Sequence, residues 1–171
     1  MRFVVTGEWS RNRLLQVIVV LYCVYVGGLW VTNSLLYFEK MSLTPESVMT
    51  YYLGDEETFR PARSYQGLLE VSHFHLFAMG MLLLVLTHLV LFIPLSNRVK
   101  AWLIVVPFLS GFADEGASWL VRYGEHVVFA WFKIGAFLTL QGSLATLIFL
   151  SLWSVFRGTS KNYRSGESPD G

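Results

Sequence analysis

The 171-residue chain is 54% hydrophobic and 16% aromatic, with only 15% charged residues and a formal net charge of +1. A composition this apolar excludes a single soluble domain, and the absence of a basic run among aromatics gives no reason to expect nucleic acid as a partner. Because Cys23 is the only cysteine, an intramolecular disulfide, a CxxC redox pair and a cysteine-rich metal site are also excluded.

Four apolar segments each approach or exceed the roughly 20 residues that a helix needs to cross a bilayer. They cover residues 14–37, 68–94, 101–121 and 127–156. The first segment follows a basic start and has a signal peptide as its alternative, but its length and the lack of a clean A-x-A-like site favour an uncleaved helix. We therefore predict an all-α, integral membrane four-helix bundle over residues 1–157, with a disordered cytoplasmic tail at 158–171.

The charges between these segments predict how the bundle is oriented. Under the positive-inside rule, the basic residues place both termini in the cytoplasm of a bacterial inner membrane. The outer loop, residues 38–67, is acidic and longer than an ordinary connection between helices, and Thr44 followed by Pro45 predicts a short helix from Pro45 to Leu53. The basic residues that set this orientation are Arg2, Arg11, Arg13, Arg98, Lys100, Arg157, Lys161 and Arg164.

The second apolar segment carries one carboxylate and three imidazoles. Ionisable groups in a membrane span are costly, so they usually face a bundle interior, a cofactor, an ion or a proton path. At about 100° per residue, five residues fall on one stripe along this helix: Glu70, His73, Gly80, Thr87 and His88. His75 falls about 200° from His73 and is expected to face another neighbour or the interface. The stripe predicts a buried site within the bundle.

Imidazole is a good iron ligand, and a glycine between two histidines leaves space for a planar macrocycle. The arrangement of His73, Gly80 and His88 resembles the small four-helix membrane b-type cytochromes, in which histidines on facing helices hold heme. The resemblance implies one heme b near the outer surface, with His73 and His126 as the axial pair and His75 as the substitute. A second, deeper heme at His88 would need a ligand other than histidine, a five-coordinate iron or another subunit.

The third segment contains the adjacent carboxylates Asp114 and Glu115, and Lys133 lies about two turns into the fourth. Isolated charges there are expensive, so we expect a buried network in which one carboxylate pairs with Lys133 or Arg122. The ion pair could serve structure alone. In the functional interpretation, Arg122 or Lys133 holds heme propionates, and Glu70, Asp114 or Glu115 accepts protons released by a quinol.

Three functions from different classes follow. The preferred one is a heme b-binding electron-transfer subunit between the quinone pool and an outer-side partner, as part of a quinol-linked oxidoreductase. That partner is a larger membrane complex or a periplasmic electron carrier, and quinone is a second candidate ligand. The second is a non-heme zinc, copper or iron enzyme or transporter built on the same carboxylates and histidines. The third is a non-catalytic subunit of a larger membrane complex, whose histidines only form hydrogen bonds between helices.

Overall fold

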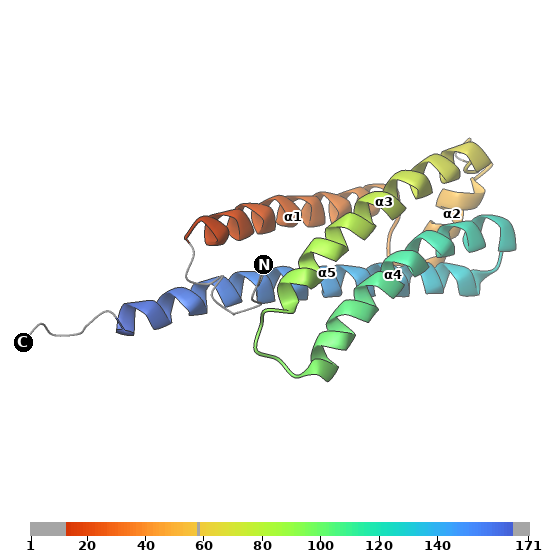
Figure 1. The fold of residues 1–171 in the computed structure, drawn as a ribbon. Helices are drawn as coiled ribbons and strands as arrows, with labels where there is room; N and C mark the ends of the chain where they lie inside the picture. Colours follow the sequence, from red (N-terminus) through yellow and green to blue (C-terminus); the bar gives the residue numbers. More distant parts are fainter. Residues whose placement is uncertain (1–12, 58, 166–171) are drawn as a thin grey trace, which may run out of the picture.

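The computed structural model describes residues 13–57 and 59–165, which form five helices and no strand longer than an isolated bridge (Figure 1). Four of them are long and apolar enough to cross a membrane, with the span in the last helix running from Val127 to Phe156. The described chain is therefore all-α with four candidate membrane spans. The helices are α1 (Arg13–Lys40), α2 (Pro45–Leu53), α3 (Tyr65–Val90), α4 (Asn97–Gly124) and α5 (Val127–Ser165).

Large apolar side chains cover the outside of the long helices. Phe74, Phe77 and Phe112 are each at least 70% exposed, and many aliphatic side chains on α1 and α3 are exposed as well. A contiguous apolar surface of this kind is unfavourable in water and is what helices facing lipid require. The exposed surface thus agrees with the four candidate spans.

Local sequence explains where the long helices begin and end. Ser64 and Ser96 cap α3 and α4, because each side chain accepts a hydrogen bond from the backbone N–H three residues later. The second predicted segment extended to residue 94, whereas α3 ends at Val90 and turns follow it. Pro94 cannot continue a helix and disfavours helical geometry in the residue before it, which accounts for the earlier end.

The helix α5 lies at the centre of the bundle and contacts α1, α2, α3 and α4 (Figure 1). Ala130 and Leu147 on this helix are fully buried. By contrast, α1 and α3 share little backbone contact, although the Tyr22 hydroxyl donates a 3.1 Å hydrogen bond to the Leu82 carbonyl. The helix α5 continues to Ser165, so residues 158–165 of the tail that was expected to be disordered are helical. Residues 166–171 lie outside the described residues.

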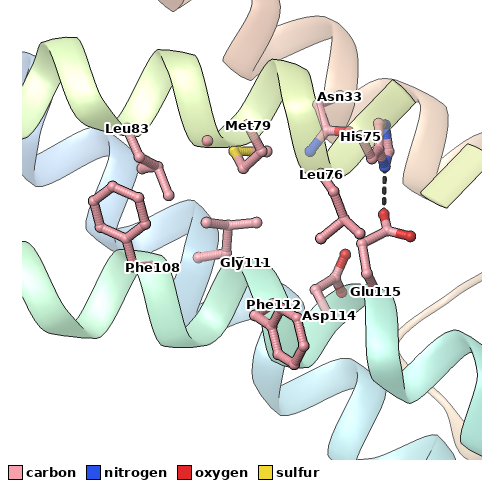
Figure 2. A pocket seen from close by; sticks show the side chains of 12 residues that line it. Asn33, His75, Leu76, Met79, Leu83, Phe108, Gly111, Phe112, Asp114 and Glu115 are labelled. Atoms are coloured by element: carbon pink, nitrogen blue, oxygen red, sulfur yellow. Dashed lines mark hydrogen bonds and ion pairs between the residues drawn. The ribbon is translucent and has the colours of Figure 1, made fainter. Parts of the chain in front are cut away.

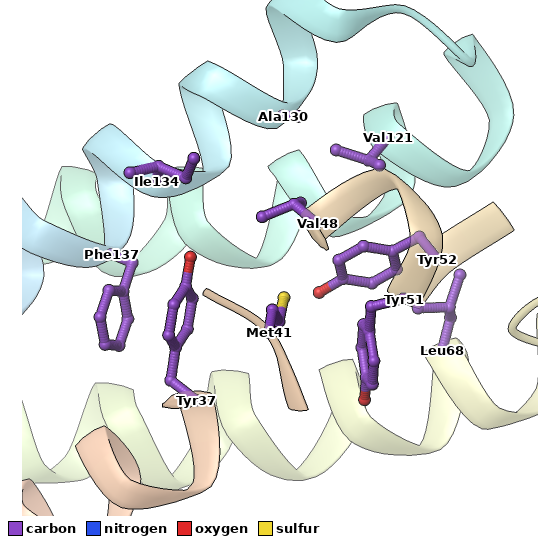
Figure 3. Packing of buried hydrophobic residues seen from close by; sticks show 10 residues of the cluster. All are labelled: Tyr37, Met41, Val48, Tyr51, Tyr52, Leu68, Val121, Ala130, Ile134 and Phe137. Atoms are coloured by element: carbon purple, nitrogen blue, oxygen red, sulfur yellow. The ribbon is translucent and has the colours of Figure 1, made fainter. Parts of the chain in front are cut away.

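The short helix predicted after Thr44 is confirmed as α2. The Thr44 side chain accepts a hydrogen bond from the backbone of Ser47, and Pro45 occupies the first turn. Figure 3 shows that α2 packs its buried side chains against the ends of the long helices. We call this the α2 end of the bundle. Its buried cluster contains Tyr37, Met41, Val48, Tyr51, Tyr52, Leu68, Val121, Ala130, Ile134 and Phe137.

The connection after α2 depends on Gly54, whose φ is +88°. A Cβ at this position would lie 2.6 Å from the Arg60 carbonyl oxygen and 2.7 Å from the Ala62 nitrogen. We expect Gly54→Ala to lower the free energy of unfolding by about 1–3 kcal/mol. Thermal denaturation in detergent measures this loss. Gly80→Ala is the control, because a Cβ there meets nothing within 4 Å; an equal loss in both variants would contradict the account.

Candidate functional site

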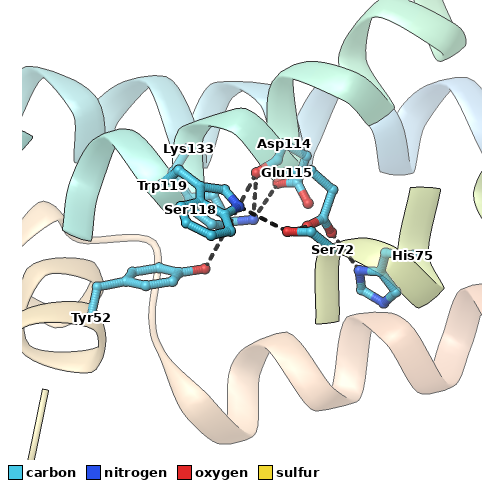
Figure 4. Close-up of polar contacts among 8 residues, drawn as sticks. All are labelled: Tyr52, Ser72, His75, Asp114, Glu115, Ser118, Trp119 and Lys133. Carbon is cyan, nitrogen blue, oxygen red and sulfur yellow. Dashed lines mark hydrogen bonds and ion pairs between the residues drawn. The ribbon is translucent and has the colours of Figure 1, made fainter. Parts of the chain in front are cut away.

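The charged centre of the bundle is an ion pair between α4 and α5 (Figure 4). The Lys133 Nζ lies 2.8 Å from Asp114 Oδ1, and it also donates a 3.0 Å hydrogen bond to the Asp114 carbonyl oxygen. The two side chains are only 6% and 14% exposed. An ammonium group buried among apolar helices needs a counter-charge and filled hydrogen-bonding positions. The expected pairing of a carboxylate with Lys133 is therefore present, and it uses Asp114.

A hydrogen-bonded chain links this pair to α2. The Ser118 hydroxyl donates a 3.2 Å bond to the Asp114 carbonyl, so its oxygen accepts from the Tyr52 hydroxyl 2.9 Å away. Burial raises the pKa of the Tyr52 phenol above its usual value, so the hydroxyl stays protonated and able to donate. The short helix is thus attached to the charged centre by a buried polar contact as well as by apolar packing.

The next residue on α4, Glu115, turns toward α3. Its Oε1 lies 2.5 Å from His75 Nδ1, and its Oε2 accepts a 3.0 Å bond from the Ser72 hydroxyl. Ser72 in turn accepts a 2.9 Å bond from the Trp119 indole N–H. A carboxylate held in this way keeps the hydrogen of the imidazole on Nδ1. Nε2 is then the ring nitrogen that has no hydrogen-bond partner among residues 13–57 and 59–165.

His75 lies where two cavities meet. One, of about 160 Å³, lies between α3 and α4 and is also lined by Asp114 and Glu115 (Figure 2). The other, of about 350 Å³, lies between α1 and α3, has an almost wholly apolar lining, and is called the α1–α3 groove below. His75, Asn33 and Met79 line both. The site therefore joins a buried polar network to an apolar groove on the outside of the bundle.

Asn33 is the second polar group at this junction. Its side chain lies beside His75 in Figure 2 and forms no hydrogen bond with any residue of the described chain. An amide in a membrane span needs a hydrogen-bonding partner, because lipid supplies none. The Asn33 amide and His75 Nε2 can therefore both bind a polar headgroup at the junction of the two cavities.

The structure separates the predicted histidine stripe from this site. Glu70, His73 and His88 are exposed, on a different face of α3 from Ser72 and the other buried residues. Glu70 accepts a hydrogen bond from a side chain on its own helix. The ring of His73 lies edge-on to Phe74 on the same helix, and the ring of His88 lies edge-on to Phe92 in the turn that follows. It is His75 that faces α4.

The remaining predicted residues lie at the α2 end or in the cavities. His126 lies in the turn before α5, where its Nδ1 accepts a 3.2 Å bond from the Val128 N–H. Arg122 donates through Nε to the Arg63 carbonyl at 2.8 Å rather than to a carboxylate. Gly80 lines the smaller cavity. Of the predicted site residues, the structure thus brings His75, Asp114, Glu115 and Lys133 together at the charged centre.

The cavities at His75 do not fit a heme held by two histidines, because no other histidine of the described residues lines either cavity. Its Nδ1 is also occupied by Glu115. Over residues 13–57 and 59–165, no group of three or more His, Cys, Asp or Glu side chains is placed to hold a metal ion. Heme b and the alternative non-heme metal centre stay predictions from the sequence, without support from this geometry.

Several residues of the site were not singled out from the sequence. Asn33 carried the clearest signal, since it is a polar amide in an apolar span. Ser72 gave only a weak signal, because serine is common where membrane helices pack together. Ser118 was expected on the same face of its helix as Asp114, and its hydroxyl does bond to the Asp114 carbonyl. Tyr52 gave no signal in the sequence, because its contact with Ser118 depends on how α2 folds back onto the bundle.

Comparison with known proteins places the chain in a family of transmembrane domains. A family model described as a transmembrane helical domain matches residues 42–162, which is more than half of the chain and includes His75, Glu115 and Lys133. The resemblance to small b-type cytochromes is therefore wrong, because the matching family is not a cytochrome b family. No curated protein and no solved structure matches the chain.

Removing the charge of Lys133 should be costly because it leaves the Asp114 carboxylate buried without its cation. We expect Lys133→Met to lower the free energy of unfolding by about 3–5 kcal/mol. The double variant Lys133→Met with Asp114→Asn removes both charges and should recover most of that loss. Thermal unfolding followed by circular dichroism in detergent measures both, with Lys40→Met at the exposed end of α1 as the control. A double variant no more stable than Lys133→Met would contradict the pairing.

Proposed function

We propose that this chain, which belongs to the Aq_1264_TM family of transmembrane helical domains, binds a neutral, lipid-soluble ligand of the quinone class. The ring of the ligand would lie in the α1–α3 groove beside His75 and Asn33. The observation that carries the proposal is the position of His75, which is bound to Glu115 through Nδ1 while its ring lines the apolar groove.

The charge balance supports a neutral ligand. The charge of Lys133 is neutralised by Asp114, which leaves Glu115 as the second carboxylate of the network. Its ion-pair partner is His75, which balances the charge of Glu115 when it takes up a proton. A fatty-acid carboxylate or a phosphate headgroup would add a second negative charge close to Glu115, in surroundings where the effective dielectric constant is low. A quinone or quinol ring carries no charge and avoids this repulsion.

The shape and depth of the groove support a flat head with an apolar tail. His75 lies about 15 Å along α3 from Tyr65, within a hydrocarbon layer roughly 30 Å thick. From there the groove continues past Leu82 to Val85, about another 15 Å of helix rise. Its wall beyond His75 and Asn33 is lined almost entirely by apolar side chains, which suits an isoprenoid tail.

The pairing of His75 with Glu115 allows both redox forms of such a ligand to bind. With its hydrogen on Nδ1, the imidazole accepts a hydrogen bond from a quinol hydroxyl through Nε2. After His75 takes up a proton, Nε2 donates to a quinone carbonyl, and Glu115 stabilises the imidazolium. The Asn33 amide can donate to a ligand oxygen or accept from a hydroxyl, so it serves either form.

We also propose that both termini lie in the cytoplasm and that the site lies in the outer half of a bacterial inner membrane. Among residues 13–57 and 59–165, the end opposite α2 carries six basic residues, whereas the α2 end carries four. The six are Arg13, Arg98, Lys100, Arg157, Lys161 and Arg164, and the four are Lys40, Arg60, Arg63 and Arg122. This distribution of basic residues follows the positive-inside rule.

Binding of decylubiquinone tests the proposal, because its short tail keeps the ring chemistry of a membrane quinone. We expect His75→Phe to weaken binding about tenfold, the loss of roughly 1.4 kcal/mol that accompanies one good hydrogen bond. Isothermal titration calorimetry in detergent measures the affinity. His73→Phe is the matched control on the exposed face of the same helix, and equal affinities for the two variants would contradict the site.

A variant that fills the groove tests the location of the ligand without touching His75. Val85→Trp adds an indole to the wall of the α1–α3 groove, so it should weaken decylubiquinone binding at least severalfold by excluding the tail. Leu84→Trp adds the same group on the neighbouring residue, which is 56% exposed and does not line the groove. If the two variants bind equally well, the ligand does not occupy this groove.

A further inference from the structure

We infer a second binding site at the α2 end of the bundle, where three arginines form a cationic surface that binds the phosphate of an anionic phospholipid headgroup. We call Arg60, Arg63 and Arg122 the arginine patch. The inference is independent of the quinone proposal, because the patch shares no residue with the α1–α3 groove.

The guanidinium groups of the patch are held in place by aromatic rings and backbone. Arg63 Cζ lies 4.2 Å from the centroid of the Tyr51 ring, and Arg60 Cζ lies 5.9 Å from the same centroid. Tyr51 is only 8% exposed, so it forms a fixed platform. Arg122 donates through Nε to the Arg63 carbonyl oxygen at 2.8 Å, which joins the end of α4 to the segment before α3. Stacking and backbone bonds of this kind reduce the entropy lost when a guanidinium binds an anion.

None of the three guanidinium groups has a carboxylate partner within the part of the chain that the structure describes. The ion pairs found there join Lys133 to Asp114 and His75 to Glu115, both inside the bundle. Arg60 and Arg63 are exposed and Arg122 is partly so. The patch therefore presents three positive charges that the described chain does not neutralise.

The patch lies at the depth of lipid phosphates. Arg63 directly precedes Ser64, the N-cap of α3, and Arg122 lies in the last turn of α4. At 1.5 Å per residue, the 26 residues of α3 span about 39 Å. That length exceeds a hydrocarbon core of roughly 30 Å but not the 40–45 Å that includes the headgroups. The ends of α3 therefore reach the headgroup layer.

A row of aromatic side chains beside the patch marks the same level. Tyr65 and Trp119 have ring centroids 5.5 Å apart, and Trp119 stacks on Tyr123 at 5.9 Å. Tyr65 and Tyr123 are 62% and 53% exposed. Tyrosine and tryptophan gather where a membrane protein meets the headgroups, because their rings are apolar and their hydroxyl or N–H is polar.

The charges around the patch favour a lipid over an acidic soluble protein. Glu46, Glu56 and Glu57 in the segment between α1 and α3 are exposed and would repel an acidic partner that approaches from the water. A phospholipid reaches the patch from the side, within the leaflet. The planar guanidinium fork also matches two phosphate oxygens at once, which gives charge-assisted, bidentate hydrogen bonds.

Titration of the detergent-purified full chain with phosphatidylglycerol, followed by native mass spectrometry, tests this inference. We expect Arg63→Gln to weaken phosphatidylglycerol binding about fivefold, the contribution of one basic residue at a membrane surface. Arg63→Lys keeps the charge but loses the planar guanidinium fork, so its affinity for phosphatidylglycerol should lie between that of the unmodified chain and that of Arg63→Gln. Arg98→Gln removes the same charge from the opposite end of the bundle and should leave binding unchanged.

Three outcomes would overturn the inference. Equal binding by Arg63→Gln and Arg98→Gln would show that the patch is not the site. Binding of inorganic phosphate as tight as that of phosphatidylglycerol would replace the lipid by the free ion, and patch-dependent binding of polyglutamate would replace it by an acidic protein. Arg60→Gln provides a second variant if Arg63→Gln fails to fold, because Arg60 belongs to the same patch, with its Cζ 5.9 Å from the centroid of the Tyr51 ring.

Discussion

The cost of one buried ammonium group fixes the arrangement of the site. Lys133 lies on the central helix, among apolar side chains, and requires a counter-charge that Asp114 on α4 supplies. Because successive helical residues differ in direction by about 100°, this contact turns the next carboxylate, Glu115, toward α3. Glu115 then needs hydrogen-bond donors, and it finds them in His75 and Ser72. The orientation of a single imidazole thus follows from a pairing on the far side of α4.

The polar network is covered by α2 on one side and borders the α1–α3 groove on the other, and the proposed function depends on both surroundings. Toward the α2 end, α2 covers the network and contributes the Tyr52 hydroxyl to it. Toward α1 the helices separate, and the hydrogen bond from Tyr22 to Leu82 joins α1 to α3 across the α1–α3 groove. His75 therefore has a fixed polar partner behind it and an open apolar space in front of it. A ligand from the membrane could reach Nε2 without disturbing the ion pair.

The sequence predicted the fold better than it predicted the site. Length and hydropathy locate the four spans, and the Thr44-Pro45 pair locates α2, because these features depend on local chemistry. The rotation of α3 is different: a membrane helix is apolar toward lipid and toward its neighbours, so the pattern does not tell which face is inside. For that reason the stripe favoured His73, whereas His75 faces α4. The choice of Asp114 over Glu115 for Lys133, and the meeting of Asn33 with His75, depend on helices far apart in the sequence.

The most direct test of the central claim, that Glu115 holds His75 with its hydrogen on Nδ1, is nitrogen NMR of the protein labelled with ¹⁵N-histidine. Comparison with His75→Gln assigns the resonances of residue 75 among the four histidines. The account predicts a protonated, strongly hydrogen-bonded Nδ1 at His75, which Glu115→Ala alters while His73, His88 and His126 stay unchanged. A His75 ring that carries its proton on Nε2 alone, or that does not respond to Glu115→Ala, would contradict it.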